Sequence, residues 1–127
     1  MYYTNFILPS DESANLIRTK GKKTKVEHKD EYSGEMKEYD INFYVLNDGS
    51  GYFWLFENCE PKAHFDATFE FKLENMEIED DPKSTKWRIR LKAGQRVFKR
   101  LVMKDMTQSW GYKYAYSFKV RTKIYED

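Results

Sequence analysis

Apolar side chains recur at every second position through most of this chain, beginning at Tyr39. Such a period puts apolar residues on one face of a β-strand and polar residues on the other. Strand-like segments occur at 39–45, 52–56, 65–73, 76–78, 87–91, 97–103 and 112–124. Short strands separated by turns form sandwiches or barrels, so we predict an all-β fold, an antiparallel β-sandwich of the C2-like or jelly-roll type with about eight strands.

Turn-forming residues interrupt this pattern. The segment 47–51 (Asn-Asp-Gly-Ser-Gly) supplies residues that tolerate positive φ, which indicates a tight hairpin between two strands. The apolar parity slips by one residue between Leu73 and Met76, so we predict a β-bulge at Asn75. Pro82 follows two aspartates and ends that strand, because proline lacks the N–H that a ladder needs.

The N-terminal region is polar and charge-rich up to Glu38. A helix is predicted over Asp11–Lys20, where Ser10 supplies the cap and Gly21 ends the helix. The residues that follow contain few apolar side chains, too few to offset the entropy lost on ordering the backbone. We therefore predict a mobile polar loop or arm over residues 19–38.

Overall charge gives little guidance toward a partner, because 22 Lys and Arg oppose 21 Asp and Glu and the net charge is +1. The length predicts a single domain over residues 1–127. Cys59 is the one cysteine, which excludes an intrachain disulfide. The sequence has no apolar run of membrane-helix length and no signal-peptide pattern, so we expect a cytoplasmic protein in a reducing compartment.

Residue types that could support catalysis are scarce. Cys59, His28 and His64 are the only thiol and imidazoles, and nothing in the sequence orients a Cys–His pair. Three possible soft ligands do not complete a Cys/His zinc site. Residues 79–81 (Glu-Asp-Asp) offer oxygen ligands for calcium but lack calcium-loop spacing, and an acidic turn that ends a strand is the favoured interpretation. We predict no catalytic residues, no metal site and no cofactor, so the protein is not expected to be an enzyme.

Acidic and basic residues are segregated along the second half of the chain. Residues 66–81 contain seven acids and one base, whereas residues 83–104 contain nine bases and no acid. Neighbouring strands could carry these opposite charges on their outer faces and so pair correctly. Alternatively, residues 83–104 could form a basic hairpin that docks on an acidic protein surface or a phosphate backbone. The residues that we predict as partner contacts are Arg88, Arg90, Arg96 and Arg100.

The last segment offers a second route to a partner. Cations alternate with apolar residues over Lys113–Lys123, which would guard an exposed edge strand against aggregation, and the same edge could pair with a partner's strand. We therefore predict a non-catalytic protein-interaction domain, an accessory or structural subunit of a larger assembly of other protein subunits. The alternative is nucleic-acid or anionic-lipid binding through the basic hairpin (83–104) and a basic arm (18–25), although no RRM, KH or cold-shock motif is present.

Three patterned segments carry a family resemblance. They are Gly51–Asn58 (GYFWLFEN), Ala67–Glu79 (ATFEFKLENMEIE) and Trp87–Leu101 (WRIRLKAGQRVFKRL). Together they resemble the β-sandwich domains that accompany the calpain-type protease core, with Ala93-Gly94 where that family usually has Pro-Gly. The resemblance implies a C2-like sandwich that contacts other domains, proteins or lipid, with catalysis in a separate papain-like domain. Nothing in this sequence matches the papain-like domain, so protease activity is not implied.

Overall fold

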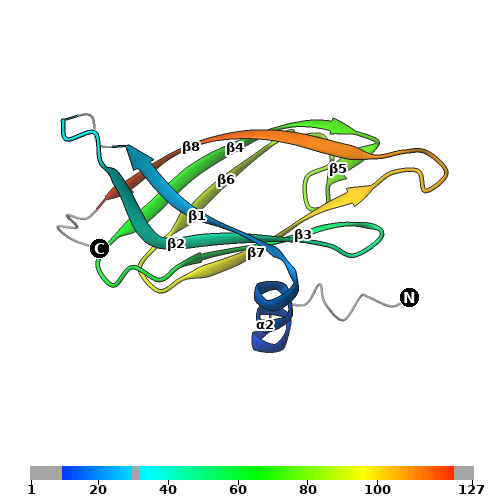
Figure 1. Cartoon of the computed structure of the whole chain (residues 1–127). Coiled ribbons are helices and arrows are strands. Elements are labelled where there is room, and N and C mark those ends of the chain that lie inside the picture. The colour runs from blue at the N-terminus through cyan, green and yellow to red at the C-terminus, as the bar shows by residue number, and fades with distance from the viewer. Residues whose placement is uncertain (1–9, 30–31, 122–127) are drawn as a thin grey trace.

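Within the residues that the computed structural model describes, 10–29 and 32–121, the chain forms one helix and eight strands. The strands build two antiparallel sheets that face each other (Figure 1). In chain order the elements are α2 (Asp11–Lys20), β1 (Lys22–Lys29), β2 (Met36–Asn47), β3 (Gly51–Asn58), β4 (His64–Glu74), β5 (Met76–Ile78), β6 (Lys86–Leu91), β7 (Arg96–Met103) and β8 (Gly111–Arg121). The predicted all-β sandwich is confirmed, and its assignment to the C2-like or jelly-roll type stays a prediction.

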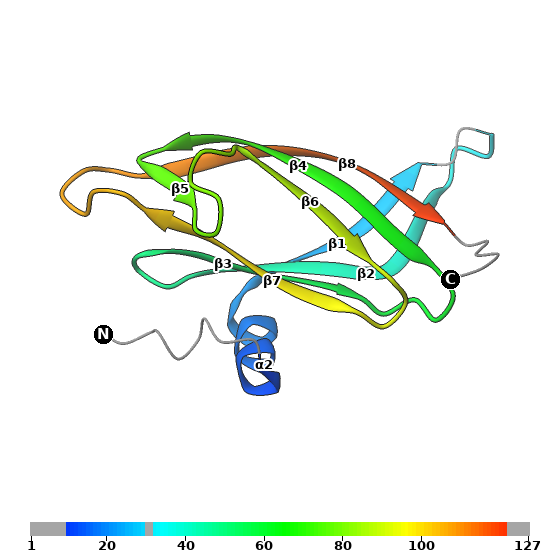
Figure 2. The same ribbon diagram turned by 180° about the vertical axis from the view of Figure 1, so that it is seen from behind.

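The two sheets differ in width. One sheet has the strand order β1-β2-β3-β7-β5 and the other has the order β6-β4-β8. The hairpin predicted at residues 47–51 joins β2 to β3, and Gly49 adopts φ +90°, a conformation that strains residues with a side chain. β8 and β1 run along one side of the sandwich in Figure 1, and β6 and β7 run along the other side in Figure 2.

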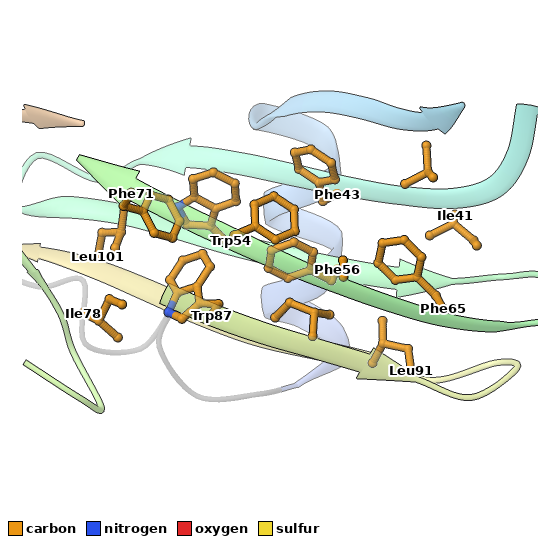
Figure 3. Close-up of a cluster of buried hydrophobic side chains, with 14 of the residues drawn as sticks. Ile41, Phe43, Trp54, Phe56, Phe65, Phe71, Ile78, Trp87, Leu91 and Leu101 are labelled. Carbon is orange, nitrogen blue, oxygen red and sulfur yellow. The ribbon is translucent and has the colours of Figure 1, made fainter. Parts of the chain in front are cut away.

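Aromatic side chains fill the space between the two sheets (Figure 3). Trp54 of β3 is fully buried, and its ring lies 5.9 Å from that of Phe56 and 6.0 Å from that of Phe43 in the same sheet. Across the core, Trp54 meets Phe71 and Trp87 edge-on, with centroid distances of 5.8 and 5.2 Å. Edge-to-face contacts add to the stabilisation from the area that each ring buries. These rings join both sheets into one core.

The predicted helix is confirmed with the same bounds. The Ser10 hydroxyl accepts a hydrogen bond from the Ser13 N–H at 3.0 Å and so caps the first turn. At the other end, the Gly21 N–H donates to the Ile17 carbonyl at 2.7 Å. A Cβ on Gly21 would lie 2.5 Å from that carbonyl oxygen, so the close approach of the backbone requires glycine.

α2 covers the outer face of the five-stranded sheet, away from β4, β6 and β8 (Figure 1). Its buried side chains form a second, smaller core with β2 and β3: Ala14, Ile17, Tyr44, Phe53 and Leu55. Beside this core, the Arg18 Nε donates to both carboxylate oxygens of Glu57, at 2.9 and 3.0 Å. Charge-assisted hydrogen bonds of this kind are stronger than neutral ones and hold the helix on β3.

The loop predicted over residues 19–38 is wrong for most of the part that the structure describes, and only residues 32–35 form a turn. Residues 19–20 end α2, the next segment forms β1, and β2 begins at Met36. β1 pairs with β2 on both sides of an irregularity at Val26, which is its one fully buried residue. Backbone pairing with β2 therefore stabilises a strand whose own sequence contains too few apolar residues to show a clear period. Residues 30–31 of the predicted loop lie outside the described part of the chain.

Asn75 marks a change of sheet, so the predicted β-bulge is instead a corner. The chain leaves β4 in the three-stranded sheet and enters β5 in the five-stranded sheet. Asn75 adopts φ +55°, a left-handed conformation that asparagine tolerates better than most residues. Its side-chain N–H donates to the Asp105 carbonyl at 2.6 Å, and its side-chain oxygen accepts from the Asp105 N–H at 3.0 Å. The slip in apolar parity reflects this corner.

Candidate functional site

β8 is an edge strand, and among the described residues its only strand partner is β4. The Phe71 N–H of β4 donates to the Thr85 carbonyl, on the β6 side. Backbone groups of successive residues point to opposite sides of a strand, so Glu70 and Lys72 face β8, opposite Ala115 and Lys113. The alternate residues of β8 therefore point their N–H and C=O groups to the open edge: Tyr112, Tyr114, Tyr116, Phe118 and Val120.

The same alternate residues carry the inward side chains of β8, and the core covers them incompletely. Tyr114 is 38% exposed and the other four are half-buried. On β6, the other edge strand of this sheet, the three inward side chains are buried: Trp87, Ile89 and Leu91. The wide sheet therefore closes over β6 and leaves the β8 side of the sandwich open.

A groove of about 560 Å³ lies between the C-terminal half of β8 and the strands opposite it, β1 and β2. His28 of β1 stacks on Tyr39 of β2, with ring centroids 5.6 Å apart. The same imidazole meets Phe118 of β8 edge-on at 6.2 Å. The rest of the β8 wall consists of Tyr116, Ser117, Lys119, Val120 and Arg121. The groove is therefore lined mainly by aromatic and aliphatic side chains.

The tyrosines of β8 remain uncharged near neutral pH. Burial, with the nearby phenols of Tyr52 and Tyr114, raises the pKa of Tyr112 to about 12. Burial also raises the pKa of Tyr114 and of Tyr116. The inward face of β8 is thus a neutral aromatic row, suited to contact apolar side chains.

The outer face of β8 is basic beside the open edge. In chain order, its exposed residues are Lys113, Ala115, Ser117, Lys119 and Arg121. Lys113 lies directly opposite Lys72 of β4, and like charges in that position repel each other. Among the described residues, neither Lys113 nor Lys119 makes an ion pair. Lys119 lies opposite Asp66 in the register with β4, but the ion pairs of that carboxylate are with arginines, so within the described residues both lysines lack an ion-pair partner.

The four arginines predicted as partner contacts divide between the two sheets. Arg88 and Arg90 lie on β6, whereas Arg96 and Arg100 lie on β7. β6 pairs with β4, and β7 pairs with β3 and β5, so residues 83–104 do not form the predicted basic hairpin. Adjacent elements of an alternating sequence need not share a sheet, and here the turn at Gly94 carries the chain from one sheet to the other.

Asp66 of β4 gathers three arginines on the outer face of the three-stranded sheet. Its carboxylate lies 3.2 Å from Arg88 Nη2, 3.5 Å from Arg90 Nε and 3.9 Å from Arg121 Nη2. The hydrogen bond from Arg88, together with the charges of all three arginines, lowers the pKa of Asp66 below its ordinary value. These contacts fit the first interpretation of the charge segregation, in which acidic β4 pairs with basic β6.

Arg100 makes its contacts within the fold. Its guanidinium donates to Asp48 at 2.9 Å and to Glu79 at 3.1 Å, and lies over the Phe53 ring at 4.6 Å from the centroid. The Arg100 side chain is 12% exposed and the Asp48 side chain only 1%. Arg96, the other arginine of β7, donates to Asp11 in the first turn of α2 at 2.8 Å. Both β7 arginines thus connect parts of this chain.

The basic arm predicted over residues 18–25 is not an arm. Arg18 binds Glu57, Lys20 ends α2, and Lys22–Lys25 belong to β1. β1 is an edge strand of the five-stranded sheet on the β8 side of the sandwich, whereas β6 lies along the opposite side (Figures 1 and 2). The β6 part of the basic segment 83–104 is therefore separated from residues 18–25, whereas its β7 part borders α2 through the ion pair of Arg96 with Asp11.

The thiol and imidazole groups occupy separate settings. Cys59 follows β3 and is exposed, and desolvation of its thiol, with the charges of Asp40 and Glu57, raises the pKa of that thiol. A raised pKa favours the thiol over the nucleophilic thiolate. His28 lies in the aromatic groove, and His64 begins β4.

The acidic turn at residues 79–81 holds β5 and β7 together. Glu79 pairs with Arg100, and Asp80 accepts a hydrogen bond from Lys99 Nζ at 3.3 Å. Across the described ranges, no three His, Cys, Asp or Glu side chains are grouped so that they could hold a metal ion. The observed contacts of the turn are thus ion pairs within the fold.

No family model, curated protein or solved structure matches this chain. The resemblance to calpain-type sandwich domains therefore stays a prediction. Among residues 10–29 and 32–121, no helix is long and apolar enough to cross a membrane.

Sequence reasoning identified the edge strand but missed the groove beside it. The last strand was predicted over 112–124, and β8 matches it as far as Arg121, beyond which residues lie outside the described part. His28 lay within the predicted loop, and Tyr39 was assigned only to a strand core. The one signal for β1 was the two-residue spacing of Thr24, Val26 and His28, which includes a single aliphatic side chain.

Proposed function

We propose that this protein is a non-catalytic protein-interaction domain that acts as an accessory or structural subunit of a larger assembly. The proposed contact surface is the three-stranded sheet on its β8 side. The observation that carries the proposal is the edge of β8, an 11-residue strand with no second strand partner among the described residues and an incompletely covered aromatic row. Proteins usually shorten or cover such edges, because an open edge can pair with another chain.

Two of the predicted arginine contacts lie on the outer face of the same sheet, on β6 at the edge opposite β8. Arg88 and Arg90 have side chains that are 59% and 65% exposed, and they lie on the same sheet as β8. Arginine is enriched at protein interfaces, where it combines charge with a planar surface. We therefore retain Arg88 and Arg90 as proposed partner contacts and assign Arg96 and Arg100 to the stability of the fold.

Binding of nucleic acid or anionic lipid is the second candidate. The outer face of the three-stranded sheet favours it, because seven cations there outnumber three anions: Lys72, Lys86, Arg88, Arg90, Lys113, Lys119 and Arg121 against Asp66, Glu70 and Glu74. The aromatic rings of β8, however, point inward to the groove, and the outer face of these three strands carries no Phe, Tyr or Trp. Single-strand binders stack bases on exposed rings, so we rank this candidate second.

Cross-linking the tagged protein in its native lysate at two salt concentrations tests the proposal. We expect a stoichiometric protein partner that survives high salt and is cross-linked through Lys113 or Lys119. The R88E/R90E variant should recover less of the protein partner. A K20E/K23E variant, with the same change in charge on α2 and β1, should recover as much of it as the wild type. Recovery of nucleic acid or lipid alone, lost as salt rises, would favour the second candidate, because phosphate contacts weaken steeply with ionic strength.

A further inference from the structure

We propose that β8 accepts an extended segment of the partner protein as an added strand, and that this segment alternates acidic with apolar residues. The inference rests on the proposed function and specifies the partner of the same surface. Three features of β8 carry it: the direction of its backbone groups, the groove on its inner face and the charge on its outer face.

The backbone of β8 is oriented to pair. Its open edge presents the N–H and C=O groups of alternate residues from Tyr112 to Val120, as the register with β4 requires. An added strand would bond to these groups and widen the three-stranded sheet. It would also lie across from β1, the strand of the wide sheet next to the open side (Figure 1). In strand addition, main-chain hydrogen bonds supply affinity and the alternate side chains supply specificity.

The inner face of β8 selects apolar residues. Every second side chain of an added strand would point toward the groove that Phe118, His28 and Tyr39 line. Apolar side chains there would cover the aromatic row, including the partly exposed ring of Tyr114. Removing this apolar surface from water favours binding.

The outer face of β8 selects acidic residues. The remaining side chains of an added strand would lie beside Lys113, Lys119 and Arg121. Asp66, which lies opposite Lys119 in the register with β4, already accepts a hydrogen bond from Arg88. The small side chains of Ala115 and Ser117 leave room between the cations. Opposite charges across neighbouring strands stabilise pairing, so acids at these positions complete the match.

The positive charge of the β8 edge also argues against a second copy of β8, or the chain's own N-terminal segment, as the added strand. Pairing two copies of β8 symmetrically about Tyr116 would place Lys113 of one copy opposite Lys119 of the other, which is unfavourable. Residues 1–9 of the chain contain no acidic residue and so lack the complementary charge. A separate acidic and apolar segment fits the edge better than either of these.

Peptide binding to the full-length protein tests the inference. The probe is a labelled peptide as long as β8 that alternates glutamate with valine or phenylalanine. Its controls are the same peptide with lysine for glutamate and the same peptide with its edge-facing amides N-methylated. We expect the lysine peptide to bind roughly ten-fold more weakly, from two or three unfavourable charge pairs, and N-methylation to abolish binding. Hydrogen exchange should slow at the amides of Tyr114, Tyr116 and Phe118 when the glutamate peptide binds.

A charge-reversal variant separates this edge from other basic surfaces. K113E/K119E should reverse the preference and bind the lysine peptide, whereas K86E/K92E, the same change on the β6 side, should keep the wild-type preference. Circular dichroism establishes that both variants fold. Equal binding of the N-methylated peptide, or protection on β6 instead of β8, would overturn the proposal.

Two further outcomes are diagnostic. If the glutamate peptide binds only after Phe6→Lys and Ile7→Lys substitutions, which the basic edge would repel, the chain's own N-terminal segment occupies the edge, and the partner strand is rejected. If a native partner is captured by a wild-type and a K113E/K119E protein alike and no peptide binds, strand addition is wrong while the protein-interaction function stands. Peptide binding without any native protein partner would instead count against the proposed function.

Discussion

Arg88 and Arg100 look alike in the sequence, since each stands in a basic segment at an alternating position. In the structure, Arg88 is exposed beside Asp66, whereas Arg100 lies enclosed by Asp48, Glu79 and Phe53. An exposed ion pair contributes little to stability, but removing one partner of a buried pair leaves a desolvated charge. Burial distinguishes Arg88, an exposed residue, from Arg100, which stabilises the fold, and burial cannot be read directly from the sequence.

We predict that Arg100→Ala lowers the free energy of unfolding by about 3 kcal/mol, because the buried Asp48 carboxylate loses its cation. The matched variant Arg88→Ala should cost under about 1 kcal/mol. Urea denaturation followed by tryptophan fluorescence measures both values. Similar losses for the two variants would contradict the structural role assigned to Arg100.

Asp66 should make stability depend on pH. Arg88 lowers the pKa of its carboxyl in the folded state, so the unfolded chain takes up the proton first as pH falls. The stabilisation is fully present above the ordinary carboxyl pKa, about 4, and is lost as pH drops through the lower folded value. The difference in unfolding free energy between wild type and Asp66→Asn should therefore shrink below about pH 4.

Urea titrations at a series of pH values from neutral to acidic measure this difference. Asp81→Asn, which changes an exposed carboxylate outside these ion pairs, is the control and should show a smaller effect at neutral pH. An Asp66→Asn difference that stays constant over the whole series would show that the arginine cluster does not stabilise the fold.

At the scale of single elements, the strongest apolar patterns were predicted best. β2, β3, β4, β6 and β8 appear where alternation was evident, and α2 has the predicted bounds because Ser10 and Gly21 mark its ends locally. β1 was missed because pairing with β2, rather than its own composition, makes it a strand. Local signals identify elements that are stabilised locally or that bury a full apolar face.

The orientation of β8 has a direct test. Ser117 faces β4 with its backbone and Tyr116 faces the open edge. Ser117→Pro should therefore destabilise the fold by about 1–3 kcal/mol more than Ser117→Ala, because a ladder hydrogen bond is lost. Tyr116→Pro should differ much less from Tyr116→Ala. Thermal unfolding measures the four variants, and equal proline penalties at the two positions would show that both N–H groups are bonded.

At the scale of the whole molecule, one aromatic core links the two sheets. Trp54 of the wide sheet contacts Phe69, Phe71 and Trp87 of the narrow sheet. Because separating the two sheets would expose these rings to water, both sheets should unfold in one cooperative transition. The wide sheet has five strands and the narrow sheet three, and the groove lies between β8 and the strands β1 and β2.

We predict that Trp54→Ala costs about 3–5 kcal/mol and lowers the stability of both sheets together. Far-ultraviolet circular dichroism and the fluorescence of the remaining tryptophans should report the same midpoint in wild type and variant. Lys86→Ala, at an exposed site on β6, is the control and should change the midpoint little. Separate transitions for the two probes would indicate that the sheets unfold independently.

The sequence by itself determined the fold class, the inward residues of most strands and the ends of α2, because these depend on periods and caps within a few residues. Only the tertiary structure decided which sheet each strand joins. The corner at Asn75 and the crossing at Gly94 distribute strands between sheets through long-range pairing. The same distribution sets five strands against three, and that imbalance leaves the β8 edge and its groove open.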